Sequence, residues 1–416
     1  MQDLRKSIDS KVASIGYQKG LHMQNLAPIA IGTYNRLSHL KLTIRALQSN
    51  YLSQLSTLYI FSDAAQEGDE EGVNRLREYL TTITGFKEVI AFKRLVNDRV
   101  ANNRGGIQYL LKKYGKVIFL EDDNITSVHF LTFMNDSLNF YQDFPSVLSI
   151  CGYTPDFKLT ETQKQHDVIA LPRLVGWGVG MWKDKVELIP EITSNDYQKI
   201  INNPSVIDHI NQNHGRDLIN RFRAESLGHI DGLDNKACFL QTQTNMFSVH
   251  PKHSLVQNIG NDGSGVHSSK NNKYDVQLWH KKDAFMFDKN IKLEKNIVSQ
   301  SVEFFSPNEQ DVSSDVLDNI FAQLQHKGIT TCSLWGIDIL SKLFIQSMPD
   351  SLTVNYMLDS WANEGTNFEG RDVITPQQAY EKGEKNIVIM SYASRFKMLD
   401  AGKKISEVLD FTYYQE

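Results

Sequence analysis

Two apolar periodicities alternate along the chain from residue 28 onward. Short apolar runs fit strands covered on both faces, and apolar residues at helical spacing fit amphipathic helices. The segment after the first run has helical spacing at Leu37, Leu40, Ile44 and Leu47. Strands are expected at 28–35, 57–65, 87–95 and 116–123, and helices at 36–50, 71–84 and 103–115. This order predicts βαβ units and an α/β fold with a mostly parallel sheet and flanking helices.

The pattern becomes less regular beyond residue 127. Residues 191–226 read as polar helices, whereas residues 268–325 show no clear period and are expected to form a linker or cover. A second alternation of strands and helices begins near Lys327 and resembles one mononucleotide-binding half of a Rossmann-like sheet. The predicted organisation is an N-terminal arm at 1–26, a main α/β domain at 27–270, a linker or cover at 271–326, and a small Rossmann-like α/β domain at 327–416.

Composition narrows the class of partner. A formal charge of -5, with 44 basic and 49 acidic residues, gives no basic footprint for nucleic acid and no polybasic membrane anchor. Cys151, Cys238 and Cys332 lie far apart and support neither a disulfide framework nor a zinc ribbon. No apolar run has the length of a signal peptide or a membrane span. We expect a cytoplasmic protein with a small-molecule or glycan partner, peripheral to the inner face of the plasma membrane if it works at a membrane.

The fourth expected strand, VIFLEDDNI, ends in three adjacent acids, Glu121, Asp122 and Asp123. Asp63 ends the second strand at the same edge of the sheet, where open α/β sheets bind ligands. Three adjacent negative charges repel one another unless a cation offsets them, and a hard divalent ion with substrate phosphates suits carboxylate oxygens. The pattern indicates a metal and phosphate site, and a solvated acidic turn is the alternative.

Several segments together resemble a GT-A glycosyltransferase. They are the TYNR turn after the first strand, Asp63 and VIFLEDD. The segments HFLTFMNDSLNFYQDF, SICGYTP, GWGVGMW and SLVQNIGNDGSGVH make the chain similar to bacterial relatives of the N-acetylglucosaminyltransferase I family. The resemblance covers residues 27–270 and not the remainder of the chain.

The resemblance implies roles for the residues that match. Asp123 would bind the Mn²⁺ or Mg²⁺ ion that bridges the donor diphosphate, Asp122 would lie near the ribose, and Glu121 would face the donor sugar. The nucleotide base and ribose would be held by Thr33, Tyr34, Arg36 and Asp63. Arg99 and Arg104 lie in the segment after the third strand, where the family has a glycine- and leucine-rich stretch, and could contact the diphosphate.

The family places its catalytic base in the stretch GHIDGLDNKACF, which makes Asp231 the first candidate and Asp234 the second. The family pattern has an aromatic residue and an arginine after the aspartate, whereas this chain has Leu233 and Lys236. This departure leaves the assignment open. Either aspartate could instead cap a helix or a turn.

Five further residues have both a functional and a structural interpretation. His267 follows glycines and could approach the diphosphate or the metal, or be a surface residue. Trp177 and Trp182 could form an acceptor platform or belong to the core. In the C-terminal domain Gly336 stands where a dinucleotide site needs three glycines. We therefore expect a degenerate domain for packing or partner docking, although Asp359 occupies a ribose-binding position.

The sequence thus predicts a metal-dependent, inverting glycosyltransferase that transfers a hexosyl or N-acetylhexosaminyl group from a nucleotide-sugar donor, UDP-linked by expectation. The acceptor would be a glycan or lipid-linked oligosaccharide in bacterial polysaccharide assembly. A sugar-phosphate nucleotidyltransferase should carry a Gly-rich, basic signature after the first strand, but IGTYNRLSHL has a single glycine and a single arginine. A glycan-binding or scaffold protein without a working base stays open because of the departure around Asp231.

Overall fold

The computed structural model describes residues 26–228, 230–262, 272–280, 284–305, 314–337, 339–360, 362, 365–390 and 408–409. The chain divides into two compact units. The first comprises Met1–Ser226 and Asp231–Phe305, and the second Leu227–Ile230 and Ser306–Glu416. Each is presented separately below.

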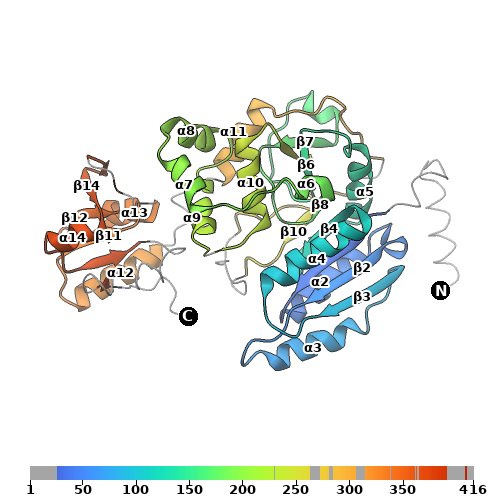
Figure 1. The fold of residues 1–416 in the computed structure, drawn as a ribbon, viewed down its shortest axis with the longest axis horizontal. Coiled ribbons are helices and arrows are strands. Elements are labelled where there is room, and N and C mark those ends of the chain that lie inside the picture. Colours follow the sequence, from blue (N-terminus) through green and yellow to red (C-terminus); the bar gives the residue numbers. More distant parts are fainter. Residues whose placement is uncertain are drawn as a thin grey trace. The chain divides into compact units, whose positions relative to one another are not determined.

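The first unit is a mixed α/β fold (Figure 1). Its described strands are β1 (Ile29–Thr33), β2 (Thr57–Ser62), β3 (Glu88–Lys93), β4 (Lys116–Glu121), β5 (Asn124–Thr126), β6 (Val147–Cys151), β7 (Val168–Leu171), β8 (Val179–Trp182), β9 (Phe247–Pro251) and β10 (Val256–Asn258). Its described helices are α2 (Leu37–Gln48), α3 (Glu70–Leu80), α4 (Arg99–Tyr114), α5 (Phe130–Phe140), α6 (Lys183–Val186), α7 (Ser194–Ile201), α8 (Pro204–Asn213), α9 (Leu218–Ser226), α10 (Leu233–Gln243) and α11 (Lys295–Phe305), with short 3-10 helices at Ser53–Leu55 and Gln163–Gln165.

A large, mostly parallel sheet organises this unit. In the described residues its strand order is β3-β2-β1-β4-β8-β6-β9-β7. Strands β3, β2, β1 and β4 are parallel to one another, and β8 is antiparallel to both β4 and β6. Strand β9 is parallel to β6 and antiparallel to β7. Strands β5 and β10 form a separate antiparallel pair. The expected α/β fold with a mostly parallel sheet is confirmed.

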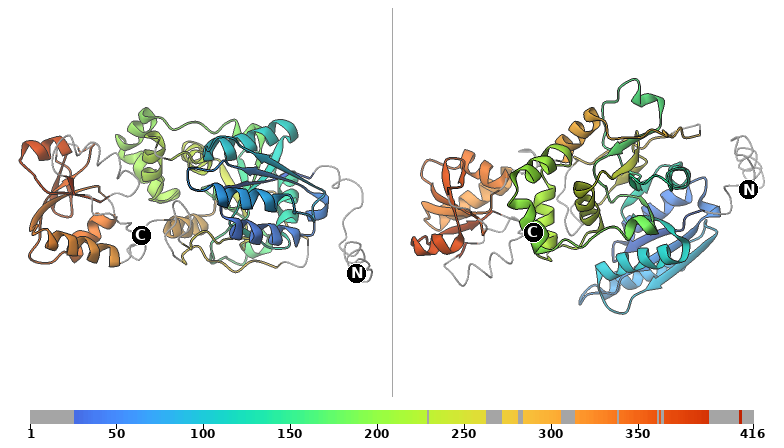
Figure 2. Two further views of the ribbon diagram at one scale, coloured as in Figure 1. Left: turned by 90° about the horizontal axis from the view of Figure 1, so that it is seen from below. Right: turned by 45° about the horizontal axis from the view of Figure 1, so that its top comes forward.

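Strands β1, β2 and β4 are buried on both faces because they are apolar at successive positions. In β1, Ile29 and Ile31 face one core and Ala30 faces the other. The first core includes Leu40 and Ile44 of α2, and the second includes Leu110 of α4. Figure 2 shows α4 (cyan) on one face of these strands and the blue helices on the opposite face. Continuous apolar strands of this kind are typical of sheets covered by βαβ crossovers.

The second unit has its own sheet and core. Its described elements are α12 (Ser314–His326), β11 (Thr331–Trp335), α13 (Ile339–Ser347), β12 (Thr353–Leu358), β13 (Asn367–Phe368), β14 (Arg371–Ile374), α14 (Pro376–Glu381), β15 (Ile387–Ile389) and β16 (Val408–Leu409). The strand order is β13-β14-β12-β11-β15-β16, parallel throughout except for the β13–β14 pair. The order of the five parallel strands follows the doubly wound α/β arrangement.

The region expected to be an irregular linker contains two helices, α11 and α12. Helix α11 has buried residues at helical spacing, Ile297, Ser301 and Phe305, so a short amphipathic signal is present there. The polar helices expected at 191–226 are confirmed as α7, α8 and α9. No helix in the described part of the chain is both long enough and apolar enough to cross a membrane. The expected arm at 1–26 lies almost wholly outside the described residues.

Candidate active site

The carboxyl ends of β1, β2 and β4 lie together at one edge of the large sheet. Gly32 of β1 is in register with Glu121 of β4, and Thr33 with Ser62 of β2. Asp63 follows β2 directly, and its backbone N–H donates to the Thr33 carbonyl at 3.0 Å. The structure therefore places the acids that the sequence singled out at the edge where α/β sheets bind ligands.

Arg36 bridges two of the three adjacent acids. Its Nη2 atom donates to Asp122 Oδ1 in a short contact and to Asp123 Oδ2 at 2.8 Å. Thr33 Oγ1 also donates to Asp122, at 2.9 Å. Burial raises the pKa of the Asp122 carboxyl, and Arg36 opposes that rise by favouring the ionised form. The guanidinium is thus the cation that offsets the adjacent carboxylates.

Asp123 is held in place by two asparagines. Asn124 Nδ2 donates to Asp123 Oδ1 at 2.9 Å, and Asn258 Nδ2 donates to the same oxygen at 2.8 Å. The pairing of β5 with β10 sets Asn124 opposite Asn258. Gly260 then passes so close to the acid that a Cβ atom there would lie 2.2 Å from Asp123 Oδ2. The two asparagines thus hold Oδ1, whereas Gly260 lies beside Oδ2, the oxygen that Arg36 contacts.

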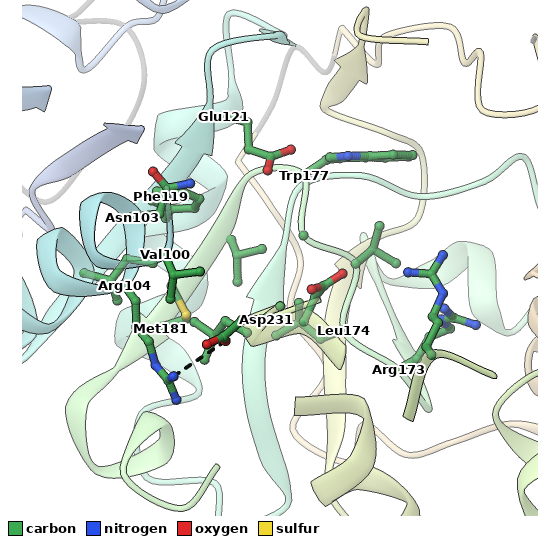
Figure 3. A pocket seen from close by; sticks show the side chains of 18 of the residues that line it. Val100, Asn103, Arg104, Phe119, Glu121, Arg173, Leu174, Trp177, Met181 and Asp231 are labelled. Carbon is green, nitrogen blue, oxygen red and sulfur yellow. Dashed lines mark ion pairs between the residues drawn. The ribbon is translucent and has the colours of Figure 1, made fainter. Parts of the chain in front are cut away.

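A cavity of about 340 Å³ adjoins this edge (Figure 3). Its wall includes Glu121, Trp177, Asp234 and Asn261. The buried Nδ2 atom of Asn261 has no hydrogen-bond partner in the described part of the chain. Within the described residues, the carboxyl groups of Glu121 and Asp234 also have no hydrogen bond or ion pair. Convergent polar groups without protein partners in a concave site are typical of ligand binding.

Glu121 differs from its neighbours because it lacks a cation partner. Burial raises the pKa of Glu121 to about 8, with further contributions from the charges of Asp123, Asp234 and Asp122. At neutral pH this carboxyl group is therefore protonated and can donate a hydrogen bond into the cavity. Asp122 and Asp123, by contrast, each form an ion pair with Arg36.

The two candidate bases have different surroundings. Asp231 Oδ1 accepts from Lys236 Nζ at 2.5 Å and lies 3.6 Å from Arg104 Nη1, the contact drawn in Figure 3. Lys236 also pairs with Glu191 at 2.6 Å. The Asp231 carboxylate is thus part of an ion-pair network with Lys236 and Arg104. Asp234, in the first turn of α10, lines the same cavity with an unpaired carboxylate.

The remaining nucleotide-site candidates are engaged in local structure. Tyr34 donates its hydroxyl proton to Asp69 at 2.6 Å. Asp63 is buried and accepts from the backbone N–H groups of Ala64 and Asp98 at 2.9 and 3.0 Å. Arg104 lines the cavity beside Asp231 and pairs with Glu191, which places it with the candidate bases. No contact joins Arg104 to Asp122 or Asp123 among the described residues.

Trp177, Trp182 and His267 differ in where the structure places them. Trp177 lines the cavity and packs edge-on against Tyr153 and Tyr274. Trp182 is buried, with its indole N–H donating to Leu138 O at 3.2 Å, so its platform role is wrong and it belongs to the core. His267 lies outside the described residues.

The C-terminal glycine adopts a constrained backbone. Gly336 has φ 127°, and a Cβ atom there would lie 3.1 Å from Met390 O. The backbone N–H of Asp359 donates to Ile374 O at 3.0 Å. Neither observation bears on nucleotide binding by this unit.

From the stretch NIGNDGSGVH, only His267 was expected at the site. The structure instead brings Asn258, Gly260 and Asn261 of that stretch to the site. The signal was available, because an Asn-X-Gly-Asn run supplies amides and a close backbone approach at a loop.

The donor chemistry of the acid pair fits a hard divalent cation. Among the described residues, no group of three or more His, Cys, Asp or Glu side chains forms a metal cage. A magnesium-like ion, however, is ordinarily held by one or two carboxylates together with substrate phosphates. Asp123 could offer Oδ2 to the ion, but this oxygen accepts a hydrogen bond from Arg36 in the structure. The residues therefore fit such an ion if the Arg36 guanidinium moves away from Asp123 Oδ2.

No protein-family model matches this chain, and no curated protein matches it. Its overlay on the mannosyltransferase PcManGT from Pyrobaculum calidifontis, solved in complex with GDP-Man and Mn²⁺, has 12% identity and a TM-score of 0.28, and covers 44% of this chain and 51% of that one. For S. aureus TarS 1–349 the values are 9%, 0.28, 48% and 70%, and for its complex with UDP-GlcNAc 10%, 0.22, 36% and 40%. The chain thus spans about half of the mannosyltransferase. Likenesses of this size assign neither a family nor an activity to the chain.

Proposed function

We propose that the first unit is a glycosyltransferase that uses a nucleotide-sugar donor. The observation that carries the proposal is the cavity at the carboxyl edge of the sheet, into which Glu121, Asp234 and Asn261 present polar groups without protein partners. The paired acids Asp122 and Asp123 lie next to Glu121 in the chain. A site of this kind offers hydroxyl-binding groups and a charged region for phosphates side by side. The GT-A name and the relation to the N-acetylglucosaminyltransferase I family are part of this proposal.

The base of the proposed reaction is Asp234, with Asp231 as the second candidate. Direct displacement at the anomeric carbon, with inversion, needs one group that takes the proton of the acceptor hydroxyl. The unpaired Asp234 carboxylate faces the cavity and can do this, whereas Asp231 is neutralised by Lys236 and Arg104. The protonated Glu121 carboxyl would donate a hydrogen bond to a hydroxyl of the donor sugar. Trp177 would offer an apolar face to a sugar ring.

The proposal includes Mn²⁺ or Mg²⁺ at Asp123, together with the donor diphosphate. A divalent ion in this position stabilises the negative charge that develops on the leaving diphosphate. Thr33, Tyr34, Arg36, Asp63 and Asp122 are proposed to hold the nucleotide. A UDP-linked donor, a glycan or lipid-linked oligosaccharide acceptor and a cytoplasmic location complete the proposal.

Thermal stabilisation of the purified chain tests the donor class. The ligands are UDP, GDP, CMP, ADP and NAD, each with and without Mn²⁺, because a ligand that binds only the folded state raises the unfolding temperature. We expect one nucleoside diphosphate to give the largest rise, and that rise to need Mn²⁺. No response to any of the nucleotides would overturn the proposal.

Two matched substitutions test the base. With the selected donor and a panel of glycan acceptors, Asp234→Asn should lower the rate of transfer by about 100-fold or more while leaving donor affinity unchanged. Asp231→Asn should have a smaller effect on the rate. The reverse ranking would move the base to Asp231. Donor binding without transfer by the wild-type chain would favour a glycan-binding or scaffold protein.

A further inference from the structure

Arg36 is the most exposed member of the charged cluster it closes. Its side chain is 24% exposed, against 5% for Asp122 and 7% for Asp123. It precedes α2 directly, and its guanidinium donates to the two aspartates. The acids are anchored independently, by Thr33 on Asp122 and by Asn124 and Asn258 on Asp123. The arginine can therefore leave while the carboxylates keep their positions.

Charge balance determines which ligands this cluster accepts. The carboxylates of Asp122 and Asp123 and the guanidinium of Arg36 together leave a single negative charge in this cluster. A divalent ion added alone would reverse that sign and place two cations against the same oxygens. A donor diphosphate added alone would bring two further negative charges to buried carboxylates. Added together, the ion and the diphosphate restore the original charge, so each relieves the repulsion created by the other.

We propose that Arg36 is a displaceable counter-ion that makes divalent metal and nucleotide bind as a pair. In the unliganded protein it offsets one of the two negative charges of Asp122 and Asp123 and keeps a metal ion away from Asp123. When metal and nucleotide arrive together, the guanidinium moves from the aspartates to a diphosphate oxygen, an interaction that suits its planar array of donors. This inference rests on the proposed function, since it assumes a nucleotide diphosphate at this site.

The exchange predicts reciprocal coupling between the two ligands. If nucleotide raises the affinity for metal by some factor, metal raises the affinity for nucleotide by the same factor. A site with a preformed metal cage would instead bind the ion without help. The described residues contain no such cage.

Mn²⁺ binding, measured by titration calorimetry and by electron paramagnetic resonance, tests the inference without any turnover. For the wild-type chain we expect Mn²⁺ affinity to rise by about 10-fold or more when UDP, or whichever nucleotide the thermal panel selects, is saturating. Without nucleotide, Arg36→Gln should bind Mn²⁺ more tightly than the wild type does, by a similar factor. This variant should also lose most of the coupling between nucleotide and Mn²⁺ binding. Arg36→Lys keeps the positive charge and should still suppress binding of Mn²⁺ alone.

Arg45→Gln is the matched control. Arg45 is an exposed arginine in the last turn of the same helix, and it should behave as wild type does. If circular dichroism shows that Arg36→Gln is unfolded, two measurements still test the counter-ion role. They are the comparison of wild type with Arg36→Lys and the measurement of how metal and nucleotide change each other's affinity.

The experiment distinguishes failure of the counter-ion role from failure of the proposed function. Equal Mn²⁺ affinity with and without nucleotide, in a chain that does bind nucleotide, overturns the counter-ion role and leaves the proposed function standing. Absence of nucleotide binding under every metal condition overturns the proposed function itself.

Discussion

The carboxyl group of Glu121 differs from those of its two immediate neighbours in having no ion-pair partner among the described residues. Asp122 and Asp123 share a guanidinium, whereas Glu121 faces the cavity without a cation, and burial raises its pKa to about 8. The folded state therefore holds a proton on Glu121 that the unfolded state releases near its ordinary pKa of about 4.3. The consequence is a stability that falls as pH rises between these two values and levels off above the higher one.

Glu121→Gln should abolish this dependence, because the amide is neutral at every pH. At pH 8 we expect the variant to exceed the wild type in free energy of unfolding by on the order of 2 kcal/mol, a value discounted for the shared charge of the adjacent acids. Near pH 4.5 the difference should shrink toward zero. Urea denaturation across this pH range measures both.

The control for this experiment is Glu67→Gln, at an exposed position that should show no such trend. A difference between Glu121→Gln and wild type that stays constant from pH 4.5 to 8 would contradict the protonated state of Glu121.

The sequence predicted which acids reach the edge of the sheet, but not what they touch there. An apolar strand that ends in acids locates Glu121, Asp122 and Asp123 by local pattern alone. Asn258 contacts Asp123 across 135 positions of sequence, and Arg36 contacts Asp122 across 86. Contacts at such separations depend on how β5, β10 and α2 come together. For the same reason local pattern could not show that Asp231 is paired with Lys236 and Asp234 is unpaired.

At the scale of elements, two adjacent glycines in α4 have opposite surroundings. A Cβ atom on Gly106 would lie 2.7 Å from ring atoms of Phe61 in β2, whereas one on Gly105 would meet nothing within 4 Å. Gly106 therefore lets the helix pack closely on the sheet. Helix α4 contributes Arg99, Asn103 and Arg104 to the cavity wall, so this close packing also positions the site.

Alanine at these two positions should change stability in opposite directions. Gly105→Ala should stabilise the fold by up to about 1 kcal/mol, because alanine is the better helix former. Gly106→Ala should destabilise it by about 1–3 kcal/mol, because the methyl group forces the helix away from Phe61. Denaturation midpoints in urea measure both, and equal shifts of the same sign would contradict the packing described.

The elements that the sequence predicted well are those with long, regular patterns. Strands β1, β2 and β4 are almost wholly buried, and the helices between the parallel strands have buried residues at helical spacing. Strands β5 and β10 span three residues each, too few for alternation to be recognised. Helix α11 was missed because its apolar positions stand among polar neighbours in an otherwise irregular stretch.

At the scale of the whole molecule, each unit has its own hydrophobic core. The cavity residues all belong to the first unit, and the second unit is built on its own parallel sheet. Separate cores lead us to expect separate unfolding transitions.

A truncated chain that ends at Phe305 should keep the donor affinity of the full-length protein and unfold in a single transition, whereas the full chain should show two. Scanning calorimetry and the nucleotide panel measure these properties. Loss of donor binding in a truncated chain that is still folded would assign a role at the site to the second unit.

In the proposed transferase, the unpaired carboxylate of Asp234 would have a metabolic consequence. It faces the cavity before any acceptor arrives, and water can reach a cavity of about 340 Å³. A base in that position would activate water as well as an acceptor hydroxyl, so donor should be hydrolysed slowly whenever acceptor is scarce. The cell would lose an activated sugar in each such event, and the balance between acceptor supply and this leak would determine how much of the donor is used productively.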